Sequence, residues 1–191
     1  MARIRKRILG IVGSPRKGGN TDILVDTILE GAKASGAKVE KIRLADLRIS
    51  PCKACYGCAK AGLCVQKDDM AKLFVKMRKS DIWVIGTPVY WWGPSAQLKA
   101  FVDRWFAKVR RQSDLAIFKD KKVILAIPMG DTSRRTARHV IGMFKDALAY
   151  VGGILLGTVL APGAYEKGEV QSHKTVLKRA RKLGEDSVKT T

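Results

Sequence analysis

The stretch ILGIVGSPRKGGNT, Ile8 to Thr21, decides how the rest of the chain can be arranged. It opens with a short apolar run, Ile8 to Val12, interrupted by a single glycine, which is typical of a strand buried on both faces. Pro15 cannot continue a sheet, and the glycines after it favour a tight turn. Apolar residues then recur at helical spacing, which predicts a helix from about Thr21 to Ser35.

A loop between a buried strand and a helix N-terminus is suited to bind an anion, because the N–H groups of the first helical turn have no partner within the helix. Neither standard phosphate motif is present, so an ordinary strand-to-helix turn is the alternative interpretation. The side chains nevertheless suit phosphate, since hydroxyl, amide and guanidinium groups can all donate hydrogen bonds to it. The predicted phosphate-binding residues are Ser14, Arg16, Gly19, Asn20 and Thr21.

The order of elements after this stretch predicts an α/β fold. Strands alternate with helices and the inner strands are apolar, which argues for a doubly wound parallel sheet of five strands with helices on both faces. The strand order 2-1-3-4-5 would place a crevice between the first and third strands, where the loops that follow both strands emerge. The other strands are predicted at Lys38–Leu44, Ile82–Gly86, Lys122–Ile127 and Ile154–Leu160, and the other helices at Met70–Met77, after Pro94, through Ile141–Val151 and over Val170–Leu183.

Length and composition are those of one domain. With 191 residues, of which 46% are hydrophobic, the chain can bury a full core, and we predict a single domain over residues 1–191 with a cysteine-rich loop at 45–69. The apolar runs fall short of the roughly 20 residues that span a bilayer. The basic start of the chain leads straight into the first strand without a signal-peptide cleavage site. We therefore expect a cytoplasmic protein that does not bind membranes.

The net charge of +20 is the most unusual feature of the composition. Such a surface attracts nucleic acid, anionic membranes or acidic proteins. The basic residues do not interleave with aromatic residues as in RNA-binding patterns, so nucleic acid is not favoured. A solvated basic surface and an acidic redox partner, an electron carrier such as ferredoxin, remain the two interpretations.

A second loop follows the strand at Ile82–Gly86 and is rich in aromatic residues. It belongs to the segment TPVYWWGPSAQLKAFVDRW, Thr87 to Trp105. An apolar, aromatic pocket suits a flat, amphipathic cofactor, although aromatic residues also occur in cores and subunit interfaces. The predicted cofactor-binding residues of this loop are Pro88, Val89, Tyr90, Trp91, Trp92 and Gly93.

All four cysteines of the chain, Cys52, Cys55, Cys58 and Cys64, lie within thirteen residues. Disulfides are disfavoured because nothing marks the chain as secreted, and zinc usually takes two cysteine pairs separated by a longer stretch. Three cysteines at x2 spacing with a fourth nearby resemble the ferredoxin run, whose thiolates hold a [4Fe–4S] cluster. Cluster ligands, zinc ligands and free or redox-active thiols remain the three interpretations. The two histidines lie near no nucleophile motif, so no catalytic side chain is predicted.

Together these motifs resemble a known family. The pattern G-S-x-R-x-G-x-N-T at Gly13–Thr21 and the segment Thr87–Trp105 are similar to the phosphate and isoalloxazine loops of NAD(P)H-dependent FMN reductases. The cysteine motif, placed after the second strand, is similar to that of the iron–sulfur flavoproteins of archaea and other anaerobes. The resemblance runs from about Lys6 to Gly168.

The resemblance implies a flavodoxin-like oxidoreductase with FMN, a [4Fe–4S] cluster on the four cysteines, and a homo-oligomer, a dimer or tetramer, in which flavin and cluster approach across subunits. The function it implies is electron transfer between cluster, FMN and an external donor or acceptor, with NAD(P)H a candidate donor. One alternative is an NAD(P)H-dependent FMN or quinone reductase without a cluster. The other is a basic binding protein with a zinc-bound loop.

Overall fold

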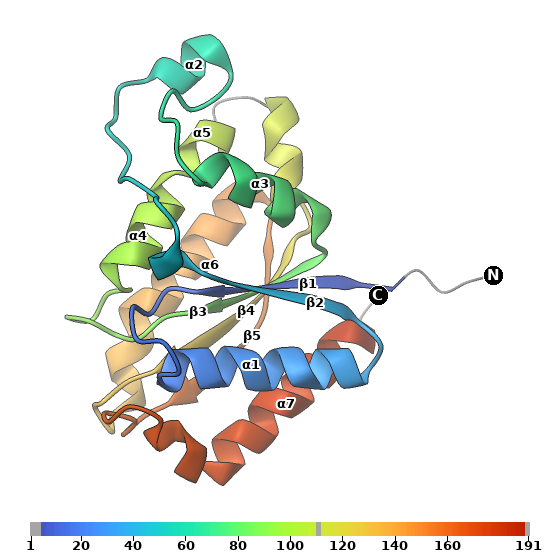
Figure 1. Cartoon of the computed structure of the whole chain (residues 1–191), viewed down its shortest axis with the longest axis vertical. Coiled ribbons are helices and arrows are strands. Elements are labelled where there is room, and N and C mark those ends of the chain that lie inside the picture. The colour runs from blue at the N-terminus through green and yellow to red at the C-terminus, as the bar shows by residue number, and fades with distance from the viewer. Residues whose placement is uncertain (1–4, 110–111, 190–191) are drawn as a thin grey trace.

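A five-stranded parallel sheet forms the centre of the molecule in the computed structural model, which describes residues 5–109 and 112–189 (Figure 1). Its strand order is β2-β1-β3-β4-β5, with every neighbouring pair parallel, so the predicted doubly wound, flavodoxin-like fold is confirmed. The strands are β1 (Arg7–Val12), β2 (Lys38–Arg43), β3 (Ile82–Gly86), β4 (Lys122–Pro128) and β5 (Ile154–Ala161).

Helices cover both faces of the sheet. Helices α1 and α7 lie on one face, and α3, α4 and α6 lie on the other (Figure 1). Among the described residues, no helix combines the length and the apolar character that a membrane span needs. The helices are α1 (Asn20–Ala34), α2 (Gly57–Ala61), α3 (Met70–Lys79), α4 (Ala96–Asp103), α5 (Phe106–Val109), α6 (Arg138–Val151) and α7 (Lys174–Lys189), with short 3-10 turns at Leu44–Asp46, Gln112–Ile117, Arg134–Ala137 and Glu169–Ser172.

Strand β1 shows why the inner strands are continuously apolar. Leu9 and Ile11 point into the core beneath α3, α4 and α6, whereas Ile8 and Val12 point into the core beneath α1 and α7. All four side chains are at most 1% exposed. Alternate side chains thus serve opposite faces, and a strand covered on both faces needs apolar residues at every position.

The C-terminal helix differs from its prediction. A helix was expected over Val170–Leu183, but a 3-10 turn occupies Glu169–Ser172 and α7 starts only at Lys174. The backbone N–H of Val170 donates to Oδ1 of Asn20 at 3.1 Å. This long-range hydrogen bond holds the segment in a turn, and no local pattern in the sequence could reveal it.

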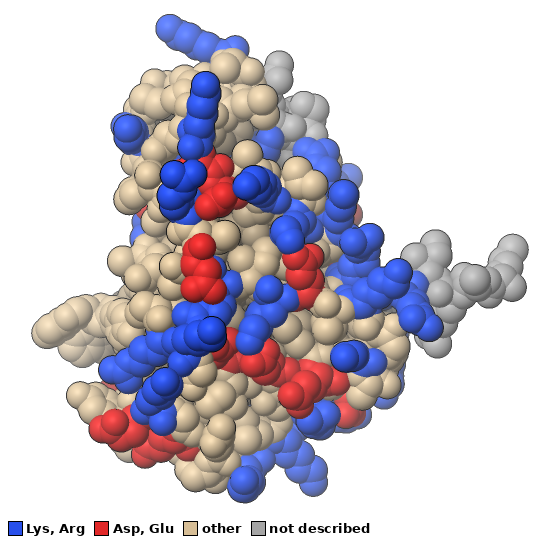
Figure 2. All heavy atoms as spheres, viewed as in Figure 1, with Lys and Arg blue, Asp and Glu red and all other residues tan. Residues whose placement is uncertain are grey.

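On the face that includes β2, α1 and α3, basic side chains are spread widely and acidic side chains lie in smaller groups among them (Figure 2). The exposed residues of α3 illustrate this composition, because every charged residue of that helix is basic. The basic side chains of α3, all exposed, are Lys72, Lys76, Arg78 and Lys79.

Candidate functional site

The loop after β1 is built around glycine and a buried hydroxyl. A Cβ atom on Gly13 would lie 2.8 Å from the Cβ of Leu98, so only glycine lets the strand end this close to α4. The Gly13 carbonyl accepts a hydrogen bond from the hydroxyl of Ser95, which also caps α4 by accepting from the Leu98 N–H at 3.3 Å. Ser95 is fully buried and connects the loop after β1 to the loop after β3. Sequence reasoning did not identify this role.

Helix α1 presents a bare N-terminus to this loop. Its N-cap residue is Gly19, which has no side chain to accept the free N–H groups of the first turn. The hydroxyl-bearing residues Ser14 and Thr21 are nearly buried beside it, 4% and 2% exposed. An uncapped helix N-terminus flanked by sheltered hydroxyls fits the chemistry of a phosphate group.

A cavity of about 430 Å³ opens over this loop at the carboxyl edge of the sheet. Its volume is within the range of small-molecule sites. Of the predicted cofactor-binding residues, nine line the cavity, whereas Gly19 and Gly93 support its loops from outside the lining. The lining consists of Ser14, Arg16, Asn20, Thr21, Pro88, Val89, Tyr90, Trp91, Trp92, Pro128, Met129, Gly130, Asp131, Thr136, Ala164, Tyr165 and Lys167.

Two walls of this cavity were not predicted. One runs from the last residue of β4, Pro128, through the following loop to Thr136, and the other is the segment from Ala164 to Lys167. The sequence contained a signal for the loop after β4, because that loop also follows a buried strand. The carboxyl ends of parallel strands lie at one edge of the sheet, so this loop lies beside those after β1 and β3. The second depends on where β5 ends and on contacts to distant residues.

The aromatic loop is a tight turn with unusual backbone geometry. Tyr90 and Gly93 exchange two backbone hydrogen bonds of 2.9 Å, which leaves Trp91 and Trp92 at the tip with φ angles of 50° and 60°. Positive φ is costly for residues other than glycine and clusters at functional sites. The Trp91 side chain is 91% exposed. The turn therefore holds two large apolar rings at the mouth of the cavity.

Asn20 lines the cavity but directs its amide away from a ligand. Its Nδ2 donates to the carbonyls of Ala164 at 3.0 Å and Glu166 at 2.8 Å, and its Oδ1 accepts from Val170 N–H. We predicted Asn20 as a phosphate-binding residue. Its described hydrogen bonds give it a positioning role, because they attach the 164–170 segment to the N-terminus of α1.

Arg16 places a guanidinium at the edge of the same loop, where its Nη1 donates to the Tyr165 carbonyl at 3.4 Å. If it also binds the phosphate, Arg16→Ala should weaken FMN binding tenfold to over a hundredfold, because a hydrogen bond to a charged group contributes about 1.5–3 kcal/mol. Titration of flavin-free protein with FMN measures the change in Kd. Lys17→Ala removes an equal charge outside the cavity lining and is the matched control. An equal Kd for FMN in both variants would show that Arg16 does not bind the phosphate.

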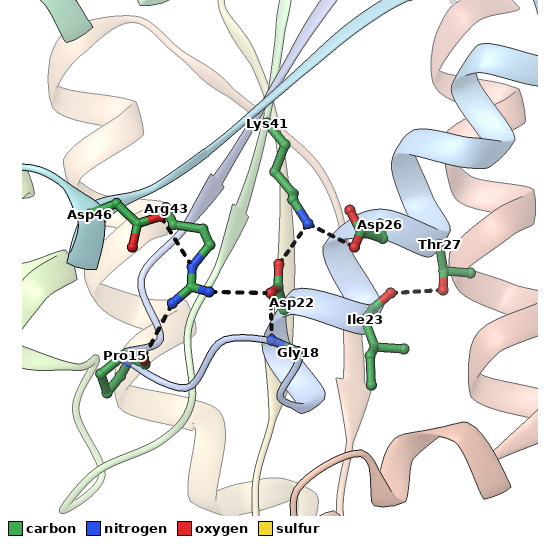
Figure 3. Close-up of polar contacts among 9 residues, drawn as sticks. All are labelled: Pro15, Gly18, Asp22, Ile23, Asp26, Thr27, Lys41, Arg43 and Asp46. Atoms are coloured by element: carbon green, nitrogen blue, oxygen red, sulfur yellow. Dashed lines mark hydrogen bonds and ion pairs between the residues drawn. The ribbon is translucent and has the colours of Figure 1, made fainter.

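A charged network lies behind the loop (Figure 3). The Asp22 carboxylate accepts a hydrogen bond from Gly18 N–H at 2.8 Å and from Lys41 Nζ at 2.8 Å. Lys41 also contacts Asp26, and Arg43 Nη1 lies 3.8 Å from Asp22. The network neutralises a carboxylate that would otherwise repel an anion in the loop.

Burial of Asp22 favours its neutral form, but the hydrogen bonds from Lys41 and Gly18 and the charge of Arg43 prevail and lower its pKa. A depressed pKa in the folded state contributes stability above the ordinary value of 3.8, and this contribution is lost as the pH falls below it. Thermal unfolding of wild type should therefore lose more stability between pH 5 and about pH 3 than that of Asp22→Asn. Equal losses in both proteins would contradict this prediction.

The cysteines lie on a different part of the molecule, around α2. Cys52 and Cys55 are exposed, Cys58 is buried and Cys64 is half-buried. All four border one small cavity of about 20 Å³, yet within the described part of the chain no three histidine, cysteine, aspartate or glutamate side chains converge as metal ligands. Four thiols are the donor set of a [4Fe–4S] cluster, and the structure brings all four to one hollow without placing three of them as ligands of one metal ion.

The fold and the cavity define a flavodoxin-like α/β protein whose carboxyl edge can hold a cofactor. The chain belongs to the NADPH-dependent FMN reductase family, whose model matches residues 6–166. It is therefore a flavin-dependent oxidoreductase, and FMN is the cofactor of its family.

Individual relatives refine this picture. The chain is 34% identical over 151 residues to an iron-sulfur flavoprotein of Methanosarcina thermophila, covering 79% of this chain and 77% of that protein. It is 42% identical over 98 residues to an iron-sulfur flavoprotein of Methanocaldococcus jannaschii, about half of either chain. An NAD(P)H:quinone oxidoreductase from Methanothermobacter marburgensis has the same fold, with a TM-score of 0.76, 19% identity and coverage of 95% of this chain and 96% of the other.

Proposed function

We propose that this protein transfers electrons between FMN in the cavity, a [4Fe–4S] cluster bound by Cys52, Cys55, Cys58 and Cys64, and an external donor or acceptor. The observation that carries the proposal is the arrangement of all four cysteines around one hollow. The relatives named iron-sulfur flavoproteins support it. When bound, FMN exchanges one or two electrons and a cluster exchanges one, so the pair can connect one-electron carriers with two-electron donors.

The residues of the chain supply binding and orientation. Ser14, Thr21 and the first-turn N–H groups of α1 would hold the phosphate of FMN, and the loop at Pro88–Trp92 would lie against its ring. The cysteine loop carries Lys53 and Lys60, both exposed, whose charge favours a more negative cluster. The +20 charge suits an acidic electron carrier such as ferredoxin, and we propose NAD(P)H as a two-electron donor.

Helix α4 keeps the two sites of one chain apart. It begins directly after the aromatic loop and ends before Arg104, which borders the cysteine hollow, and it is roughly 12 Å long at about 1.5 Å per residue. The two cavities share no lining residue. Following the resemblance to iron–sulfur flavoproteins, we propose a homo-oligomer, a dimer or tetramer, in which the cysteine loop of one chain lies near the flavin cavity of another.

Protein purified without oxygen tests the proposed function. We expect flavin bands together with a broad iron–sulfur absorption, and iron and acid-labile sulfide in equal amounts. A second candidate is an NAD(P)H-dependent FMN or quinone reductase with free thiols. It is favoured because no three histidine, cysteine, aspartate or glutamate side chains of the described residues are placed to hold one metal ion. Flavin bands without iron would support that candidate. Zinc without sulfide would support a zinc-bound loop.

A further inference from the structure

A buried arginine lies between the fold and the cysteine loop. Arg104 follows α4 and is only 1% exposed. Its guanidinium binds both oxygens of Asp68, with Nη1 at 2.5 Å and Nη2 at 3.0 Å, and Nη1 also donates to the Ser50 carbonyl at 2.9 Å. Ser50 and Asp68 lie at the two ends of the cysteine segment. Arg104 therefore holds both ends of that segment against α4.

The same guanidinium contacts a cysteine. Its Nη2 donates to Sγ of Cys64 at 3.3 Å, within the range expected for sulfur acceptors. Arg104 also borders the hollow that the four cysteines share. The contacts of Arg104 with Asp68 and Ser50 explain how it holds the ends of the cysteine segment. They do not explain why the guanidinium also contacts the sulfur of Cys64. That contact directs a permanent positive charge at a predicted cluster ligand.

A charged donor on a ligand sulfur has a defined electrostatic consequence. Reduction adds one negative charge to a cluster, and hydrogen bonds to the sulfurs and nearby positive charges favour that more negative state. Because Arg104 is buried, water screens its interaction with Cys64 less than it screens the exposed lysines of the loop. Asp68 balances the charge of Arg104, so the effect of Arg104 comes from its hydrogen bond to the Cys64 sulfur, a contact that the exposed lysines do not make in the described hydrogen bonds.

We propose that Arg104 is a positioning residue of the cysteine site, which orients Cys64 toward the shared hollow and raises the reduction potential of a cluster bound there. The proposal rests on the proposed function, because it concerns the same cluster. It assigns to Arg104 an effect on cluster potential in addition to its structural contacts with Ser50 and Asp68.

Two variants and one control test this role by redox titration, monitored by the spectrum of the cluster. Arg104→Lys keeps the charge but loses the planar fork that reaches Asp68 and Cys64 together. The double variant Arg104→Gln with Asp68→Asn removes both members of the buried ion pair, so that no charge is left uncompensated. Lys60→Gln removes an exposed loop charge that lies outside the cysteine hollow and serves as the control.

The double variant removes the hydrogen bond to Cys64 at unchanged net charge. It should shift the equilibrium between oxidised and reduced cluster about tenfold toward the oxidised form, which lowers the midpoint potential by about 59 mV for a one-electron couple. Arg104→Lys should lower it less, and Lys60→Gln least. FMN affinity should be unchanged in all three.

Unchanged potentials in both Arg104 variants would overturn the proposal. Loss of FMN binding together with the cluster would also overturn it, because it would show that Arg104 acts only in folding. Wild-type protein without iron would defeat the proposed function itself, before any variant is compared.

Discussion

Replacing Cys58 with alanine is expected to abolish the proposed [4Fe–4S] cluster and to leave FMN bound. Cys58 is the most sheltered of the four cysteines, 8% exposed in the short helix α2, and a cluster that loses one of four thiolates loses a covalent ligand. The flavin cavity shares no lining residue with the cysteine hollow, so its loops should keep their geometry. Iron and acid-labile sulfide should fall to background while the flavin content remains that of wild type.

Ala61→Ser is the matched control for this experiment. It changes an exposed residue of the same helix and keeps all four thiols. Its iron and sulfide should equal those of wild type. Full iron and sulfide in Cys58→Ala would remove Cys58 from the ligand set, and loss of FMN as well would show that the two sites depend on each other.

Gly184→Ala is expected to separate α7 from α1 and to destabilise the fold. A Cβ atom at position 184 would lie 2.0 Å from the backbone oxygen of Ile28, and one at Gly31 would lie 2.1 Å from the backbone oxygen of Arg181. The two helices thus meet backbone to backbone, and neither contact can be relieved by rotating a side chain. Overpacking typically costs about 1–3 kcal/mol, and the loss here should lie at or above the upper end.

Urea unfolding of purified protein measures this loss as a lower midpoint with an unchanged slope. Gly142→Ala is the control, since Gly142 lies within α6 and a Cβ atom there would meet nothing within 4 Å. That variant should gain about 0.5–1 kcal/mol from helix propensity. Equal stability of the two variants would contradict the close approach of α1 and α7.

The sequence predicted the fold well because the fold depends on local patterns. The apolar run at Ile8–Val12 is buried on both faces, and the parallel sheet follows from alternating strands and helices. The strand, loop and helix of residues 8–34 could be predicted for the same reason. The fourteen residues from Ile8 to Thr21 contain a strand, a glycine-rich turn and the first residues of a helix. Few other local structures are compatible with that pattern.

The polar contacts of the site were harder to predict because they join residues far apart in the chain. Asp68 was expected only to suit the start of a helix, and its Oδ1 does accept Met70 N–H at 3.2 Å. Its main partner is Arg104, which lies 36 positions away and was read only as part of the aromatic segment. Asn20 similarly pairs with residues 144 to 150 positions away. Side-chain chemistry shows that such groups need partners, but not which partners the fold brings near.

The two edge strands of the sheet, β2 and β5, differ in their protection against pairing with a strand of another molecule. Strand β2 carries Lys38, Glu40 and Lys41, and charges on an outer strand discourage another chain from adding to it. Strand β5 has no charged residue, and Ile154 at its start is 42% exposed. Protection against strand addition is therefore concentrated at β2. An added strand, in aggregation or in assembly, would meet fewer charges at β5 than at β2.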